Sequence, residues 1–182
     1  MEKKKERVEI FIDAGNFHHS TKNARKRGFE VDLRKIINEL SGDREVKTFY
    51  YIGLLDPDYN LEKYEEQKQL IENLKKIHNF KVVLCDMRKT KMGNEVKYEI
   101  KGDDIYLAHD LLLGAFDNLY EVAIIVSGDA DFIPVINTLR KRFKKKIGNA
   151  YFRRTSSFKL RKACDFSVNL NKLIRRLNAK KE

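Results

Sequence analysis

The chain has 182 residues, of which 42% are hydrophobic and 36% are charged. This length buries enough apolar surface for one globular domain over residues 1–182, and the composition excludes a largely disordered chain. Lysine and arginine exceed aspartate and glutamate by 38 − 27 = 11, so we expect a polyanion, most often nucleic acid, as the partner. A charged surface that serves only solubility is the alternative.

Two features of the sequence indicate the compartment. Cys85 and Cys164 have neither a second cysteine nor a close histidine to complete a zinc pattern, so we expect both to be buried as small hydrophobic side chains. No apolar stretch is long enough to span a bilayer, and the charged first residues contain no signal-peptide core. We therefore expect a cytoplasmic protein without a membrane partner.

The first half of the chain alternates between strands and helices. A run of β-branched and aromatic residues over 8–12 predicts a buried strand that ends at Asp13, followed by a loop at Ala14-Gly15-Asn16. Apolar residues at helical spacing, with Asp32 suited to the cap, predict a helix over 32–40. The same patterns predict a strand over 46–52, a helix over 61–77 and a strand over 80–85.

The second half continues this alternation. Residues 86–97 are polar and basic and contain the turn-forming pair Gly93-Asn94, so we expect an exposed basic loop there. The patterns predict helices over 104–116 and 131–142 and strands over 122–126 and 146–151. This order predicts a three-layer α/β/α fold with a mostly parallel central sheet, whose ligands bind beyond the carboxyl ends of the strands.

Acidic residues follow two of the predicted strands. Asp13 closes the first, and Asp129 and Asp131 come just after the strand over 122–126. The carboxyl ends of parallel strands lie at one edge of the sheet, and carboxylates gathered there repel one another unless a cation or a proton compensates them. The alternative is that each aspartate merely caps the helix that follows it.

A further carboxylate lies on the apolar side of a predicted helix. In the helix over 104–116 the apolar stripe, which includes Leu107 and Leu111, centres on Asp104. An ionised carboxylate on this inward face costs several kcal/mol unless it is protonated, capped or bound to a cation. Asp103 and Asp110 fall on the solvated flank, where we expect ordinary surface charge, with an outer supporting role as the alternative.

Oxygen ligands without histidine or cysteine favour a hard cation, Mg²⁺ or Mn²⁺, over zinc. Asn16 lies three residues beyond Asp13, and Ser127 precedes Asp129. Each of these two polar side chains could hydrogen-bond a phosphate, or could instead order its own turn. Neither acts alone as a nucleophile, because the sequence shows no serine, histidine and acid arrangement.

Basic clusters recur along the chain and are interleaved with aromatic residues. We expect them to hold a nucleic-acid strand by its phosphates. Tyr151, Phe152 and Phe158 could stack on unpaired bases, although core packing is the expected role for at least one of them. The clusters are Arg88 to Lys91, Lys141 to Lys146, Arg153-Arg154, Lys159 to Lys162 and Arg175-Arg176.

Three ordered motifs resemble the NYN domain, specifically the LabA-like branch of the PIN-like nucleases. They are Phe11-Ile12-Asp13 with Asn16-Phe17, the stretch from Lys101 to Asp110, and Ser127-Gly128-Asp129-Ala130-Asp131-Phe132. The segment from Ser156-Ser157 to Ala163-Cys164-Asp165 also looks similar, so the resemblance covers nearly the whole chain.

The resemblance implies a PIN-like fold and a ribonuclease that uses Mg²⁺ or Mn²⁺ to hydrolyse RNA, with single-stranded RNA as the expected substrate. It implies catalytic roles for Asp13, Asp104, Asp129 and Asp131, of which the first three would bind the metal. Asn16, Ser127, Lys101 and Ser156 match positions on the substrate side. PIN nucleases often supply a further acid from an early helix; Glu39 lies on such a helix, but no motif assigns it.

Two other functions are compatible with these residues. One is a PIN-like module that binds RNA without turning it over, and the other is a phosphoryl hydrolase for small molecules, against which the positive charge argues. DNA as a substrate and a homodimer both stay open.

Overall fold

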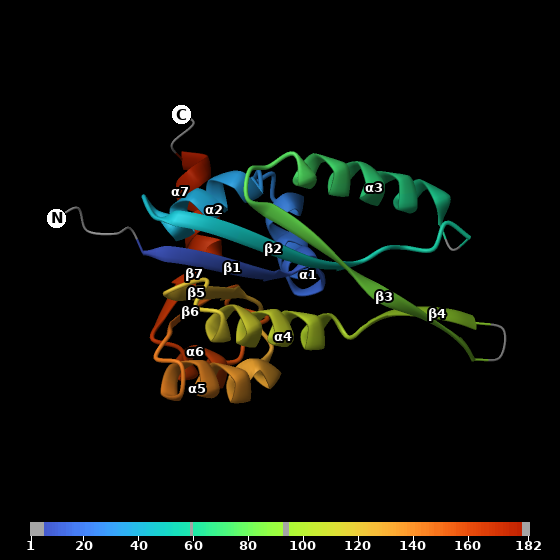
Figure 1. Ribbon diagram of the computed structural model, residues 1–182. Coiled ribbons are helices and arrows are strands. Elements are labelled where there is room, and N and C mark those ends of the chain that lie inside the picture. The colour runs from blue at the N-terminus through green and yellow to red at the C-terminus, as the bar shows by residue number, and fades with distance from the viewer. Residues whose placement is uncertain (1–5, 59, 93–94, 180–182) are drawn as a thin grey trace.

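Seven strands form one sheet with helices on both faces in the part of the chain that the computed structural model describes, residues 6–58, 60–92 and 95–179 (Figure 1). The strand order is β4-β3-β2-β1-β5-β6-β7, and every neighbouring pair is parallel except β3 and β4. The strands are β1 Arg7–Asp13, β2 Glu45–Gly53, β3 Phe80–Met92, β4 Glu95–Lys101, β5 Val122–Val126, β6 Lys146–Tyr151 and β7 Phe166–Asn169.

Helices connect the strands and confirm the predicted mostly parallel α/β/α architecture. They are α1 Ala14–Lys26, α2 Leu33–Ser41, α3 Leu61–Lys75, α4 Asp103–Phe116, the short 3-10 helix η1 Ala130–Phe132, α5 Ile133–Lys141, α6 Phe158–Ala163 and α7 Leu170–Ala179. Within the described ranges, no helix combines the length and the apolar character needed to cross a bilayer.

Two hydrophobic cores lie on opposite faces of the sheet. Ile10 and Ile12 of β1 belong to the core under α1, α2, α3 and α7, whereas Phe11 belongs to the core under α4, α5 and α6. In Figure 1 these helices lie above and below the sheet, for example α3 above and α4 and α5 below. Both faces of β1 are covered, which explains the apolar run Ile10-Phe11-Ile12. Cys85 and Cys164 are both buried, as predicted.

The order in which strands join the sheet reverses at β1. The chain first adds β2 and β3 on one side of β1, and then returns to place β5 and β6 on the other side. The carboxyl ends of β1 and β5 therefore flank the switch point, where parallel sheets form ligand crevices. Asp13 ends β1 and Ser127 follows β5, so two of the predicted acidic motifs meet at this edge.

The prediction of an exposed loop over 86–97 was wrong. β3 continues to Met92 and pairs with β4 in an antiparallel ribbon, from Asp86 opposite Lys101 to Met92 opposite Glu95. Figure 1 shows this ribbon reaching beyond the helical layers. A strand that extends past the core needs no apolar alternation, so the sequence lacked the usual strand signal. The predicted turn pair Gly93-Asn94 lies outside the described residues.

Helix α1 replaces the loop predicted at Ala14-Gly15-Asn16. The Asp13 carboxylate caps this helix by accepting a hydrogen bond from the backbone N–H of Asn16 at 2.9 Å. That cap, together with the burial of Phe17 on the helix, compensates for a glycine in the first turn. Elements α6, β7 and α7 were also not predicted. The helices predicted over 32–40 and 61–77 are confirmed, and Asp32 caps the first of them.

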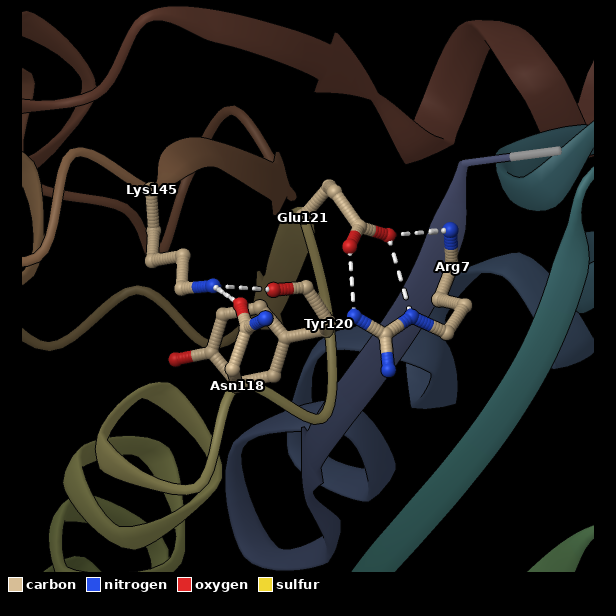
Figure 2. Close-up of polar contacts among 5 residues, drawn as sticks. All are labelled: Arg7, Asn118, Tyr120, Glu121 and Lys145. Carbon is tan, nitrogen blue, oxygen red and sulfur yellow. Dashed lines mark hydrogen bonds and ion pairs between the residues drawn. The ribbon is translucent and has the colours of Figure 1, made fainter. Parts of the chain in front are cut away.

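Polar contacts fasten the opposite, amino edge of the sheet (Figure 2). The Arg7 guanidinium donates to Glu121 at 2.5 and 3.2 Å, and the Arg7 backbone N–H donates to the same carboxylate at 2.7 Å. Nearby, the Lys145 ammonium donates to the Asn118 side chain at 2.5 Å and to the Tyr120 carbonyl at 2.7 Å. These contacts join the starts of β1, β5 and β6 far from the switch point.

We expect the ion pair between Arg7 and Glu121 to make the free energy of unfolding depend on pH. Hydrogen bonds from the Arg7 side chain lower the pKa of Glu121 to about 2. A depressed pKa stabilises the fold above the ordinary glutamate value, and this stabilisation is lost as pH falls from about 4.5 towards 2. We expect Glu121→Gln to lower the Tm at pH 7 by only about 1–3 °C, because the pair is partly exposed.

Thermal unfolding at pH 7 and at pH 3 checks this expectation. The wild-type protein should lose more Tm between the two values than Glu121→Gln, whereas Glu66→Gln, an exposed control on α3, should behave as wild type. Equal acid sensitivity of Glu121→Gln and wild type would show that the pair makes no such contribution.

Candidate active site at the carboxyl edge

Asp13 is the most buried carboxylate at the switch point, with 8% of its surface exposed. Its Oδ1 accepts from the Asn16 backbone N–H at 2.9 Å, and its Oδ2 accepts from the Ser127 hydroxyl at 3.0 Å. Burial raises the pKa of Asp13, these hydrogen bonds oppose the rise, and the charges of Asp103 and Asp129 add to it. The side chain is therefore fixed in orientation but poorly compensated in charge.

A chain of hydrogen bonds orders the loop after β5. The Asp129 backbone N–H donates to the Ser127 hydroxyl at 3.2 Å, and the Asp131 backbone N–H donates to Oδ1 of Asp129 at 2.9 Å. Asp129 thus caps η1, as the capping alternative expected, and Asp131 is exposed at the rim. Ser127 is buried, and its hydroxyl orders both this turn and Asp13.

Asn149 supports this loop from β6, and the sequence reasoning missed it. The side chain is fully buried, and its Nδ2 donates to the carbonyls of Ile125 at 3.0 Å and Ser127 at 2.9 Å. Within the described residues, its Oδ1 has no hydrogen-bond partner. A single asparagine inside the apolar strand Lys146–Tyr151 was the available signal.

Gly128 packs directly against the loop between β6 and α6. A Cβ atom at this position would lie 2.0 Å from the Thr155 carbonyl oxygen, so only glycine allows the two backbones to approach this closely. The Ser157 backbone N–H donates to the Gly128 carbonyl at 3.0 Å. The acidic loop and the segment beginning at Thr155 therefore form one wall.

The first turn of α4 brings Asp104 to the same edge, although not in the predicted way. Leu107 and Leu111 are buried as the helical stripe predicted, but Asp104 is exposed rather than inward. The helical wheel therefore identified the face of α4 that packs on the core. Asp104, however, lies in the first turn, at the end of the helix, where the core no longer covers that face. Partial removal from water, together with the charges of Asp103 and Asp13, raises the pKa of Asp104 to about 6.

Asp110 departs from the prediction in the opposite sense. It was placed on the solvated flank of α4, but it is half-buried and accepts a hydrogen bond from the Tyr51 hydroxyl at 2.9 Å. Burial raises the pKa of Tyr51, and the Asp110 charge adds to the rise. Asp110 therefore anchors α4 to β2, because Tyr51 lies on a strand that the helical wheel could not take into account.

Aspartates from three separate chain segments act on one another electrostatically. The charge of Asp129 raises the pKa of both Asp13 and Asp104, and Asp131 also raises that of Asp104. Carboxylate oxygens are the ligands that Mg²⁺ and Mn²⁺ prefer, and a divalent ion would relieve this repulsion. The chemistry of the donor set therefore fits a hard divalent cation.

The aspartates are not already arranged around an ion. Across the described residues, no three histidine, cysteine, aspartate or glutamate side chains form a group that could hold a metal. Mg²⁺ usually keeps several waters and binds through one or two carboxylates and the phosphates of its substrate. This open arrangement is compatible with such an ion.

Comparison with known proteins agrees with this architecture. A family model described as the NYN domain matches residues 7–171. The chain belongs to the NYN domain family. NYN domains are a nuclease-like group within the PIN superfamily, so the fold and the nuclease-like class predicted from the sequence are confirmed at that level.

One solved structure resembles this NYN domain over almost its entire length. It is a crystal structure of a protein of unknown function from Vibrio parahaemolyticus RIMD 2210633, with 24% sequence identity and a TM-score of 0.73. The match covers 93% of this chain and 96% of that chain. It supports the fold alone. A comparison with curated proteins gives no match.

The remaining residues that the sequence predicted for the site of the NYN domain do not lie in one cluster. Ser156, half-buried, accepts from Arg161 at 3.2 Å in the segment that packs against Gly128, and exposed Lys101 ends β4. Asn16 lies in the first turn of α1. Glu39, considered as a further acid, forms an ion pair with Arg176 of α7.

The predicted basic clusters and aromatic residues do not form one surface but lie in different parts of the molecule. The cluster from Lys141 to Lys146 reaches the start of β6 and thus the amino edge, whereas Arg153-Arg154 follow β6 at the carboxyl edge. Phe152 is buried and packs edge to face against Phe17, which gives it a core role. Phe158 is largely exposed, and the cationic groups of Arg161 and Lys162 lie over its ring.

Proposed function

We propose that this NYN domain is a Mg²⁺- or Mn²⁺-dependent ribonuclease of the LabA-like branch that hydrolyses phosphodiester bonds of single-stranded RNA. The supporting observation is that Asp13 at the end of β1, Asp104 on α4 and the loop after β5 meet at the switch point, where the charge of Asp129 raises the pKa of both Asp13 and Asp104. A large excess of positive charge over the whole chain attracts the polyanionic substrate.

Asp13, Asp104 and Asp129 would hold the ion. When bound, it would lower the pKa of a water molecule and neutralise charge that develops on the attacked phosphate. Asp13 is rigid, because the Asn16 N–H and the Ser127 hydroxyl fix its two oxygens. Asp131, exposed at the rim, would orient the attacking water.

Polar side chains around the edge would position the RNA. Asn16 lies beside Asp13, close to the proposed cleavage point, whereas the buried Ser127 would act on the RNA through Asp13, whose carboxylate its hydroxyl orients. Lys101 at the end of β4 and Ser156 beside Gly128 would contact phosphates on the two sides of the aspartates. These contacts place the sugar-phosphate backbone without reading its sequence.

Cleavage of labelled single-stranded RNA tests the proposal. Wild-type protein with Mn²⁺ should shorten the RNA, and chelator should stop the reaction. Asp13→Asn should be inactive, whereas Asp43→Asn, an exposed control at the turn before β2, should cleave as wild type does. Cleavage that persists in Asp13→Asn, or in chelator, would refute the proposed site.

The second candidate is an RNA-binding NYN domain without turnover. It is favoured by one observation, namely that the described aspartates do not yet form a three-ligand metal group. The same assay separates the two functions. RNA binding that weakens steeply with salt, with intact RNA recovered in Mn²⁺ and in Mg²⁺, would support the binding module.

A further inference from the structure

A cavity of about 280 Å³ lies beside the proposed active site and has no role in the chemistry above. Its walls come from α1 and the residues just after it, from the segment after β6 and from the start of α7. This volume is near the lower end of cavities that hold small organic ligands.

The cavity is strongly cationic. Its lining includes Arg27, Arg153, Arg154, Lys172 and Arg175, and contains no aspartate or glutamate. Across the described ranges, none of these five side chains forms an ion pair. Five like charges around one hollow repel one another, and an anion that enters it relieves that repulsion.

The interior of the cavity also has apolar and amide groups. Phe29 is half-buried in the lining, with Ile174 buried beside it, so a flat apolar surface is present among the cations. The Asn23 side chain, exposed on α1, adds hydrogen-bonding groups. Phosphate-binding cations next to an aromatic surface are the combination that holds one unstacked nucleotide of a single strand.

Helix α1 links the cavity to the aspartates. Asn16, Ser20 and Asn23 recur at spacings of four and three residues, so they lie on one face of the helix, and Arg27 follows at its C-terminal cap. Along the axis this stripe and Arg27 cover about 16 Å from the proposed cleavage point to the cavity. A single RNA strand following the stripe would place a nucleotide in the cavity a few positions from the cut.

The wall between the two sites is continuous. The hydroxyls of Ser20 and Thr155 are 2.6 Å apart, and both residues line the cavity. The Thr155 carbonyl in turn packs against Gly128, in the loop that carries Asp129. The cavity therefore shares the wall at Thr155 with the loop that carries Asp129.

We propose that this cavity binds one nucleotide of a single-stranded RNA substrate, with its phosphate against Arg27 and Arg154 and its base against Phe29. The inference rests on the proposed function only in taking RNA as the substrate. The cavity thereby binds the RNA strand at a second point, at a distance from the bond that is cut. This second contact sets the direction in which the RNA enters the active site.

Equilibrium binding in chelator, where the proposed reaction cannot proceed, tests the cavity separately from catalysis. The variant Arg27→Gln/Arg154→Gln is compared with Lys63→Gln/Lys76→Gln, which removes the same charge from exposed positions on and just after α3. The cavity variant should bind a 3′-labelled RNA oligonucleotide at least ten-fold more weakly. Its slope of log affinity against log salt should fall by about 0.7, because one phosphate of a single strand is no longer neutralised.

The control variant should keep both its RNA affinity and its salt slope within error of wild type. Equal weakening in the two variants would overturn the proposal, because it would show that net charge alone sets the affinity. Circular dichroism establishes that both variants are folded. If the cavity variant loses RNA affinity but wild type fails to cleave RNA in Mn²⁺, the nuclease proposal falls and the cavity assignment stands.

Competition distinguishes a nucleotide from a phosphate ion. AMP should displace the RNA at a concentration at least ten-fold lower than inorganic phosphate does, because the base adds its contact with Phe29. Equal competition would overturn the nucleotide assignment. Tight AMP binding combined with unchanged RNA affinity in the cavity variant would identify a site for free nucleotide and would also overturn it.

Discussion

Replacing Asp104 by asparagine is expected to abolish metal-dependent RNA cleavage while slightly stabilising the metal-free protein. The charges of Asp103, Asp13 and Asp129, together with partial removal from water, raise the pKa of Asp104 to about 6. At neutral pH the folded protein therefore carries a repulsion that the unfolded chain does not have. Asparagine removes this repulsion and also a proposed metal ligand.

The two effects differ in size. Cleavage should fall by at least about 100-fold, comparable with the removal of one electrostatic contact to a transition state. A full shift of the pKa would correspond to about 3 kcal/mol, but the side chain is exposed, so we expect a gain of about 1 kcal/mol or less after solvent screening.

The stability difference should depend on pH in a defined direction. Because the folded pKa is raised, the wild-type penalty is absent below about pH 4, grows as pH rises and is complete above about pH 6. Urea denaturation in chelator at pH 7.5 and at pH 4 should therefore show an advantage for Asp104→Asn only at the higher pH. Asp43→Asn is the control, and an equal gain in that variant would remove the evidence for a repulsive cluster.

The predicted strands that carry the site agree closely with the structure, because they pack on both faces. The predicted strand over 8–12 corresponds to β1, and the strands over 122–126 and 146–151 are found with the same bounds. Apolar runs such as Ile10-Phe11-Ile12 in β1 and Val122–Val126 arise where helices cover a sheet on both sides. Since the strands were correct, the meeting of Asp13 with the loop after β5 could also be predicted.

Elements whose formation depends on tertiary contacts were harder to predict. Helix α1 begins with Ala14-Gly15, which has no sequence signal for a helix, and depends on capping by the buried Asp13. Within the described residues, the part of β3 beyond Cys85 pairs with β4 and no longer with β2. Local secondary-structure propensity predicts neither element well. In both cases the conformation depends on contacts that the local sequence pattern does not show.

A helical wheel also could not predict how deeply a residue on α4 is buried. The wheel gave Asp104 the correct face but not the correct exposure, because it contains no information on where the core ends along the helix axis. Similarly, it placed Asp110 in solvent, although Tyr51 from β2 meets it there. Fold and family class could be predicted from the sequence, whereas the supporting residues around the aspartates required the three-dimensional structure.

Replacing Asn149 by aspartate is expected to cause the largest loss of stability. The asparagine Nδ2 donates to the carbonyls of Ile125 and Ser127 from a fully buried position. An aspartate of nearly the same shape would place a carboxylate against two acceptors, so it would lose both hydrogen bonds and face like partial charges. We expect a loss of at least about 3 kcal/mol at pH 7.

The same substitution should also impair cleavage, because the Ser127 carbonyl belongs to the residue whose hydroxyl holds Asp13. Burial without a cation raises the pKa of the new carboxylate, so its destabilising effect should be greatest at neutral pH and smaller at pH 4, where a protonated acid can donate to one carbonyl. Urea denaturation at both values measures this difference, with Asn38→Asp, an exposed position on α2, as the control. Wild-type stability of Asn149→Asp at pH 7 would mean that the asparagine does not fasten the end of β5, and the rigidity assigned to Asp13 would then lack its support.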